Sequence, residues 1–347
     1  MPRPMSVRMA GLVAALALSI AVRASAQTPV DSSLTRLQAE LQRTAPGDTL
    51  RGTLGVAMLH LETGRMVSLH GRDRFPMAST VKLPIALTLL RRVDQGTINL
   101  DSTLAIQPWD LHPGSGTLNG THPARGQRIS LRDLLSLMLT VSDNSATDML
   151  LRTVGGATPV MDRLKESRLD GITVSRSTIE LIADALGIPA LPADTLRTLA
   201  RFDSLARKVS DADQKAAGQR LLKDPRDTAT PEGMVRLLEA LWTRRVLREE
   251  TTRQLLGIMY KCETGPNRIK GMLPDSTAVA HKTGTLTMGI ANDVGIITLP
   301  GTAGHVAIAL FLSGSHDDDA TKDRALASVA RTAFDYFLFT PPTRAAP

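Results

Sequence analysis

Cysteine, aromatic residues and long apolar runs are all scarce in this sequence. A single cysteine, Cys262, excludes an intramolecular disulfide, so we expect it to be buried as a small apolar side chain. Aromatic residues make up 3% of the 347 residues, which argues against a stacking surface for single-stranded nucleic acid. Only one long apolar run is present, which argues against a polytopic membrane protein. The seven histidines show no metal-ligand spacing, so no metal or other cofactor is expected.

Charge is balanced apart from a small positive excess. Lysine and arginine number 41 against 34 acidic residues, and three of the positives (Arg3, Arg8 and Arg23) lie in the first 26 residues. The remaining basic residues are dispersed among acids, which is typical of a solvated surface and not of a nucleic-acid footprint. With 42% hydrophobic residues, the chain is long enough to bury a sizeable core.

The N-terminus has the pattern of an export signal. Arg3 and Arg8 precede an apolar run over residues 10–22, and Ala24-Ser25-Ala26 fits a small-residue cleavage site. We therefore predict a signal peptide over residues 1–26. The mature chain, 27–347, would be periplasmic or secreted, with no stable membrane anchor after cleavage. The alternative is an uncleaved anchor helix, for which 13 apolar residues are short.

The order of predicted elements favours an α+β fold. Strand-like runs occupy residues 54–59, 66–69, 278–286, 293–299 and 305–312, while residues 81–93, 131–139, 231–243 and 321–339 show helical patterns. We predict an antiparallel five-stranded sheet made from both chain ends and flanked by helices, with an all-helical subdomain inserted. The expected boundaries are a sheet part over about 50–75 and 262–347, and a helical part over about 76–261. A polar excursion spans 176–227.

Three short motifs carry candidate chemistry. In Ser79-Thr80-Val81-Lys82, a hydroxyl and an amine three residues apart share one face at the start of a predicted helix. A serine hydroxyl needs an adjacent base to act as a nucleophile, and a neutral lysine can serve. Alone this pattern is weak, because it occurs by chance in many proteins.

The second motif, Ser142-Asp143-Asn144, follows the predicted helix at 131–139. Its hydroxyl could relay a proton to a leaving nitrogen, and its amide could hold both the lysine and a substrate. A helix-capping turn is the alternative.

The third motif, Lys282-Thr283-Gly284, lies on a predicted strand and is followed by Thr285. The lysine could orient an anionic substrate, and Gly284 permits close approach of a backbone. The N–H groups of Thr285 and Ser79 could form an oxyanion hole. The alternative is a polar strand end.

In this order and on these element types, the motifs resemble those of the class A β-lactamases, which are penicillin-recognising serine hydrolases. The resemblance covers about residues 50–340 and extends to Phe75-Pro76, Gly155-Gly156, Asp227-Thr228-Ala229-Thr230-Pro231 and Ala291-Asn292-Asp293. It implies a β-lactamase/transpeptidase-like fold, a monomer, and a β-lactam or peptidoglycan stem peptide as the ligand. By this resemblance Ser79 is the nucleophile, Lys82 the acylation base and Ser142 the proton relay. Substrate binding falls to Asn144, Lys282, Thr283, Gly284, Thr285 and Arg268.

One segment departs from the family pattern. The omega loop of the family reads Arg-x-Glu-x-x-Leu-Asn, and its Glu and Asn hold the water that hydrolyses the acyl-enzyme. Here Arg176 and Leu181 match, but Thr178 and Ile182 stand at the Glu and Asn positions. Glu180, two residues late, could act as the base only if the loop is rebuilt.

Three functions remain open on this sequence. The first is a serine β-lactamase that works through an acyl-enzyme on Ser79. The second is a penicillin-binding D-alanyl-D-alanine peptidase or esterase with slow deacylation, which the altered omega loop favours. The third is a non-hydrolytic sensor that binds a β-lactam or peptidoglycan.

Overall fold

The computed structural model describes Met1 and residues 32–44, 50–120, 126–193 and 198–340. The predicted signal peptide, residues 1–26, therefore lies outside the described residues apart from Met1. Among the residues that are described, no helix is long and apolar enough to cross a membrane.

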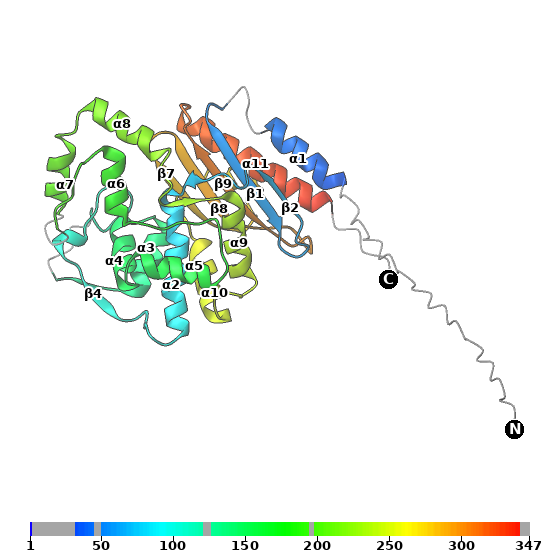
Figure 1. Cartoon of the computed structure of the whole chain (residues 1–347), viewed down its shortest axis with the longest axis horizontal. Coiled ribbons are helices and arrows are strands. Elements are labelled where there is room, and N and C mark those ends of the chain that lie inside the picture. The colour runs from blue at the N-terminus through cyan, green and yellow to red at the C-terminus, as the bar shows by residue number, and fades with distance from the viewer. Residues whose placement is uncertain (2–31, 45–49, 121–125, 194–197, 341–347) are drawn as a thin grey trace. The chain divides into compact units, whose positions relative to one another are not determined.

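The main sheet has five antiparallel strands drawn from both ends of the chain (Figure 1). Its order is β2 (Met66–Leu69), β1 (Thr53–His60), β9 (His305–Ser313), β8 (Ile290–Thr298) and β7 (Val279–Leu286). Strand β1 pairs with β9 along its whole length, from Thr53 opposite Ser313 to His60 opposite Val306. The predicted α+β fold with a sheet from both chain ends is confirmed.

Both faces of the sheet are covered by helices, so its strands read as nearly continuous apolar runs. Alternate residues of β1 divide between two cores. Val56 and Met58 join the core that includes residues of α1 (Ser32–Thr44) and α11 (Asp319–Phe339). Ala57 and Leu59 join the larger core that includes residues of α9 (Pro231–Trp242).

The inserted part of the chain is helical. At its centre α2 (Lys82–Asp94) is buried nearly all round, as its continuous apolar sequence predicts. It contacts four other helices. These are α3 (Leu131–Thr140), α4 (Asn144–Thr153), α5 (Ala157–Glu166) and α10 (Glu249–Met259). Two short pairs of strands lie beside this block, β3 (Phe75–Pro76) with β6 (Thr228–Ala229) and β4 (Thr103–Ala105) with β5 (Arg128–Ser130).

The region 176–227 contains three described helices, α6 (Thr178–Leu186), α7 (Leu199–Ala206) and α8 (Asp211–Leu221). Helix α8 packs on α6, and Leu221 of α8 joins a small apolar cluster with Ala78 and Ile290. A side chain at Gly218 would collide with Met288 in the turn between β7 and β8. This turn puts the start of β8 at Ile290, three residues before the predicted start at 293.

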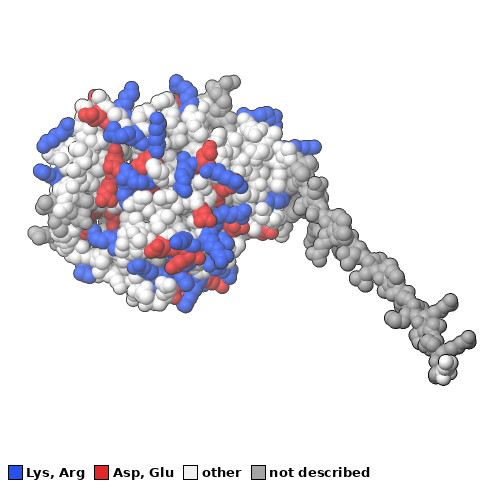
Figure 2. All heavy atoms as spheres, viewed as in Figure 1, with Lys and Arg blue, Asp and Glu red and all other residues white. Residues whose placement is uncertain are grey.

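Basic and acidic side chains are intermingled over the face seen in Figure 2. That face carries no broad area of one charge, in keeping with the solvated surface expected from the sequence.

Candidate active site

Ser79 lies in a short 3-10 helix, η1 (Ala78–Val81), that leads directly into α2. Two contacts fix the chain just before Ser79. Strand β3 pairs with β6, and Met77 N donates a hydrogen bond to Asp227 O. Ala78, immediately before the serine, has a φ of 47°, in the left-handed region that is unfavourable for alanine by about 1–3 kcal/mol. Strain of this kind persists only where the surrounding structure enforces it, and it is common at active sites.

Two lysine side chains meet on one serine hydroxyl. Lys82 Nζ and Lys282 Nζ each lie 3.0 Å from Ser142 Oγ. Lys82 also donates to the Ser142 carbonyl oxygen at 2.6 Å and to Asn144 Oδ1 at 3.0 Å. Both lysines are fully buried. The structure therefore brings together residues from all three motifs, which are widely separated in the sequence.

Burial and mutual repulsion weaken the basicity of both lysines. Burial lowers the pKa of Lys82 well below its usual value, and the charge of Lys282 lowers it further, although Asp143 and Asp148 oppose this shift. Burial also lowers the pKa of Lys282, to about 8, with Cys262 and Asp293 opposing and Arg268 adding to the shift. A lowered pKa makes the deprotonated form of Lys82 easier to reach, and that form can accept a proton.

The Ser142-Asp143-Asn144 loop is also the capping turn that was its alternative interpretation. Asp143 caps α4 by accepting from Ala146 N at 2.8 Å, and it holds the Thr117 and Leu118 N–H groups at 2.7 and 2.9 Å. Asn144 donates to Pro113 O at 2.9 Å while its Oδ1 accepts from Lys82. The capping residue thus fixes the loop, and its two neighbours face the lysines.

Strand β7 passes very close to Ser79. A Cβ on Gly284 would lie 2.6 Å from Met77 O and 3.0 Å from Ser79 N, so only glycine fits there. Arg268 is 92% buried and lies behind this strand. Its guanidinium donates to Gly284 O and to Thr285 Oγ1, at 3.1 and 2.9 Å, and pairs with Asp323. Arg268 therefore touches Thr285, the residue predicted to share in the oxyanion hole.

A cavity of about 50 Å³ contains Ser79. Its lining includes Lys82, Asn144 and Thr285, and also Thr178 and Ile182, which the sequence pattern places at the family's Glu and Asn positions. The full lining is Ala78, Ser79, Val81, Lys82, Ser115, Asn144, Thr178, Leu181, Ile182, Thr285 and Leu286. No carboxylate is among these described residues. Nor does the described part of the chain contain a group of His, Cys, Asp and Glu side chains arranged to hold a metal ion.

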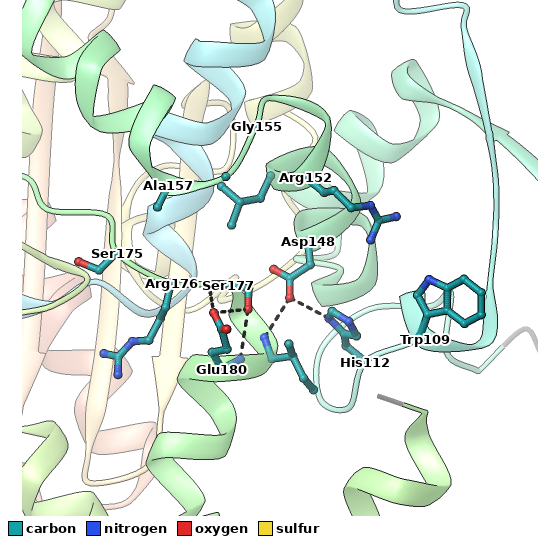
Figure 3. A pocket seen from close by; sticks show the side chains of 13 residues that line it. Trp109, His112, Asp148, Arg152, Gly155, Ala157, Ser175, Arg176, Ser177 and Glu180 are labelled. Atoms are coloured by element: carbon teal, nitrogen blue, oxygen red, sulfur yellow. Dashed lines mark hydrogen bonds and ion pairs between the residues drawn. The ribbon is translucent and has the colours of Figure 1, made fainter. Parts of the chain in front are cut away.

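Glu180 does not line this cavity. It lines a separate hollow of about 400 Å³, where its carboxylate accepts from Ser177 N and Ser177 Oγ at 2.9 and 2.8 Å (Figure 3). These bonds close a capping box at the start of α6. The omega-loop carboxylate proposed from the sequence is thus committed to its own helix, and the geometry does not favour it as a base for Ser79 chemistry.

Cys262, His281 and Asp293 form a buried polar group near Lys282, and the sequence did not predict that they lie together. His281 Nδ1 lies 2.9 Å from Asp293 Oδ1, and both residues are about 99% buried or more. Burial raises the pKa of the nearby Cys262 thiol, but the charges of His281 and Lys282 lower it to about 7. The three residues come from separate segments with no diagnostic spacing. The sole signal was a histidine beside the motif lysine.

Comparison with known proteins places these features in context. Residues 36–337 match the model of the Beta-lactamase enzyme family. The chain is 27% identical over 296 residues to beta-lactamase VEB-1 of Pseudomonas aeruginosa, covering 82% of this chain and 85% of that protein. It is 26% identical over 340 residues to the extended-spectrum beta-lactamase PER-1 of the same organism, covering 96% and 97%.

Solved structures of β-lactamases also match this chain. The crystal structure of TLA-1 extended-spectrum beta-lactamase is 27% identical, with a TM-score of 0.71, and the match covers 88% of this chain and 99% of that one. A beta-lactamase from Chitinophaga pinensis is 30% identical, with a TM-score of 0.68, and the match covers 86% and 98%.

Proposed function

The chain belongs to the β-lactamase enzyme family, and on this premise we propose that Ser79 opens the β-lactam ring to form an acyl-enzyme. The protein is a serine hydrolase of the class A β-lactamase type, and the relatives that it matches are named β-lactamases. The observation that carries the proposal is the meeting of Lys82 and Lys282 on Ser142 Oγ, next to the segment that holds Ser79.

Acylation uses the neutral form of Lys82. Ser79 Oγ attacks the β-lactam carbonyl carbon, and the Ser79 proton passes to Lys82. The oxyanion that forms faces the N–H groups of Ser79 and Thr285. As the C–N bond of the ring breaks, Ser142 gives its proton to the leaving nitrogen and recovers one from Lys82 across 3.0 Å. The net result is that Ser79 loses one proton and the leaving nitrogen gains one, while Lys82 and Ser142 return to their starting states.

The substrate carboxylate binds at the β7 side of the cavity. Protonated Lys282 supplies the charge, and Thr283 and Thr285 supply hydroxyl donors. Arg268 lies behind the strand and holds Thr285 in place. Asn144, already bonded to Lys82, positions the acylamino side of the substrate.

Lys82 is also the base for deacylation in this proposal. It is the single titratable side chain in the described lining of the Ser79 cavity. Neutral Lys82 takes a proton from water as the water oxygen attacks the acyl carbon. The ester bond to Ser79 then breaks, and Lys82 returns this proton to Ser79 Oγ, which restores the free serine and the neutral lysine. Thr178 and Ile182 cannot supply the carboxylate and amide that the family uses at these positions, so we expect this step to limit turnover.

The presence of Thr178 and Ile182 in the cavity favours a second candidate function. A cavity with Thr178 and Ile182 where a water-activating pair is expected also suits a penicillin-binding D-alanyl-D-alanine peptidase or esterase, or a sensor, in which the penicillin adduct persists.

Intact mass spectrometry through a full time course separates these functions. The mature chain is mixed with excess benzylpenicillin until the drug is consumed. An adduct that appears and then decays with release of hydrolysed drug is expected. An adduct that persists would support the peptidase or sensor function. Ser79→Ala is expected to abolish labelling, and retained labelling would overturn the assignment of Ser79.

Export and a monomeric state also belong to this proposal. They rest on the pattern of residues 1–26 and on the family resemblance. N-terminal sequencing of the protein recovered outside the cytoplasm is expected to begin at Gln27, and light scattering is expected to give the mass of one chain. An N-terminus at Met1 in the membrane fraction would contradict cleavage.

A further inference from the structure

The carboxylate-binding edge of β7 is linked to a buried thiol by two hydroxyl groups. Cys262 Sγ lies 3.4 Å from Thr264 Oγ1, and Thr264 Oγ1 is hydrogen-bonded to Thr283 Oγ1. Thr283 lies two residues from Thr285 in β7, so both side chains point to the same face of the strand. Thr285 lines the Ser79 cavity. A change at Cys262 can therefore reach Thr283 through Thr264.

Each threonine hydroxyl has one proton, so the row can be oriented in two ways. When Cys262 is a thiol, it can donate to Thr264 O, which lies 3.8 Å away. Thr264 is then free to donate to Thr283, and Thr283 is free to donate to a substrate carboxylate. When Cys262 is a thiolate, it accepts from Thr264. Thr264 then accepts from Thr283, whose proton points away from the substrate.

His281 makes the second state accessible. Its Nδ1 is held by Asp293, while its Nε2 is buried and has no hydrogen bond of good geometry. A thiolate at Cys262 would give this nitrogen a charged partner. Cys262 also affects His281. Burial lowers the pKa of His281, but Asp293 and Cys262 raise it to about 10.

We propose that Cys262 is a positioning residue for substrate binding, which sets through Thr264 whether the Thr283 hydroxyl can donate to an anionic substrate group. This inference rests on the proposed function, because it concerns the carboxylate of the same substrate. Affinity for that carboxylate is highest when Cys262 is a thiol and falls when it ionises.

Other charged groups lie near Cys262, and their effects on substrate affinity must be separated from the effect of Cys262 ionisation. Lys282, next to His281 on β7, lowers the pKa of Cys262, and Asp293 on β8 acts through His281. Arg268, which donates to Thr285 Oγ1, lowers the pKa of Lys282. Lys261 and Glu263, on either side of Cys262, are exposed. Lys282 itself titrates at about 8, so pH alone cannot isolate the effect of Cys262.

A double-mutant cycle removes the contribution of Lys282. The dissociation constant Ks of the pre-acylation complex with benzylpenicillin is measured at pH 6 and pH 8 for four proteins. These are the wild type, Thr283→Val, Cys262→Ala and the double variant. In the wild-type background and in the Cys262→Ala background, Lys282 titrates both with and without the Thr283→Val substitution. The ratio of the two Ks values within one background therefore reports the Thr283 hydroxyl alone.

In the wild-type background, Thr283→Val is expected to raise Ks about tenfold or more at pH 6, the effect of one charge-assisted hydrogen bond. At pH 8 the same substitution is expected to change Ks by less than about threefold. In the Cys262→Ala background the tenfold effect is expected at both pH values. Cys262→Ser, which keeps the side-chain size and does not ionise in this range, is expected to behave like Cys262→Ala and serves if that variant folds poorly.

Two results would overturn the inference. A Thr283→Val effect that is equal at pH 6 and pH 8 in the wild-type background would show that Thr283 does not respond to Cys262. Absence of any acylation of Ser79 in the wild-type protein would overturn the proposed function and this inference with it. Normal acylation with an unchanging Thr283 effect would overturn the inference alone.

Discussion

At the scale of the residue, Gly284 sets the separation between β7 and the nucleophile. The Cβ of an alanine there would lie 2.6 Å from Met77 O and 3.0 Å from Ser79 N, closer than real contacts allow. Strand β7 would have to move away from η1, and the N–H groups of Ser79 and Thr285 would no longer face one oxygen. We expect Gly284→Ala to lower the acylation rate at least about tenfold, measured with a fluorescent penicillin, since losing one oxyanion donor alone has a larger effect.

A glycine elsewhere provides the matched control. Gly257 lies in α10, and a Cβ there would meet nothing within 4 Å. Gly257→Ala is expected to keep the acylation rate within about twofold and to stabilise the fold by up to about 1 kcal/mol, because alanine favours a helix. Equal acylation rates for the two variants would contradict the role assigned to Gly284.

Lys282 gives the reaction a pH dependence whose direction follows from its charge. Its pKa is lowered to about 8, and the protonated form attracts the substrate carboxylate. In the Cys262→Ala variant, which removes the titrating thiol, acylation efficiency is therefore expected to fall as the pH rises through about 8, where Lys282 loses its charge. The methyl ester of benzylpenicillin has no carboxylate, so its slower acylation should lack this decline. An equal decline for acid and ester would show that the titrating group acts without the substrate carboxylate and is not Lys282.

At the scale of the element, the start of α6 depends on one buried carboxylate from α4. Asp148 accepts from Thr178 N at 2.7 Å and Ile179 N at 3.0 Å, and it lies 2.9 Å from His112 Nδ1 (Figure 3). Asp148→Ala leaves these buried donors without an acceptor. We expect it to reduce the free energy of unfolding by roughly 3 kcal/mol, measured by urea denaturation.

Asp211 is the control for this prediction, because its carboxylate also lies at the start of a helix, α8, but is exposed. Asp211→Ala removes a favourable interaction with the helix dipole, which is expected to reduce stability by less than about 1 kcal/mol. Similar losses for the two variants would show that Asp148 acts only through the helix dipole.

The elements themselves were largely readable from local patterns. The continuous apolar run of α2 and the proline at the start of α9 predicted both helices. The capping box of Ser177 and Glu180 was equally local and readable. This capping box predicts that the Glu180 carboxylate bonds to the start of its own helix. Only the tight turn at Met288 and Gly289, both with positive φ, moved a strand boundary by several residues.

At the scale of the whole molecule, the site is built where distant segments meet, and this is what local patterns do not reveal. The three motifs could be assembled only because together they resemble a known family. Asp293 was part of the resemblance, but nothing local linked it to His281 or Cys262, and Asp148 reaches α6 only through the tertiary fold. Long-range contacts of this kind depend on how the sheet and the helical block pack, and no spacing in the sequence encodes them.

The cavity around Ser79 is lined by residues from η1, α2, α4, α6 and β7. The proposed difference from the family lies in α6, at Thr178 and Ile182. Thr178→Glu with Ile182→Asn would restore a carboxylate and an amide there. Glutamate suits the first turn of α6, because it interacts favourably with the helix N-terminus. We expect this double variant to accelerate decay of the penicillin adduct at least about tenfold, measured by intact mass spectrometry after excess drug is removed. Thr178→Gln with Ile182→Asn has the same size without the charge and is expected to leave decay near the wild-type rate, as is Glu180→Gln. Equal acceleration by the Glu and Gln versions would mean that added polarity, and not a base, is what the wild-type cavity lacks.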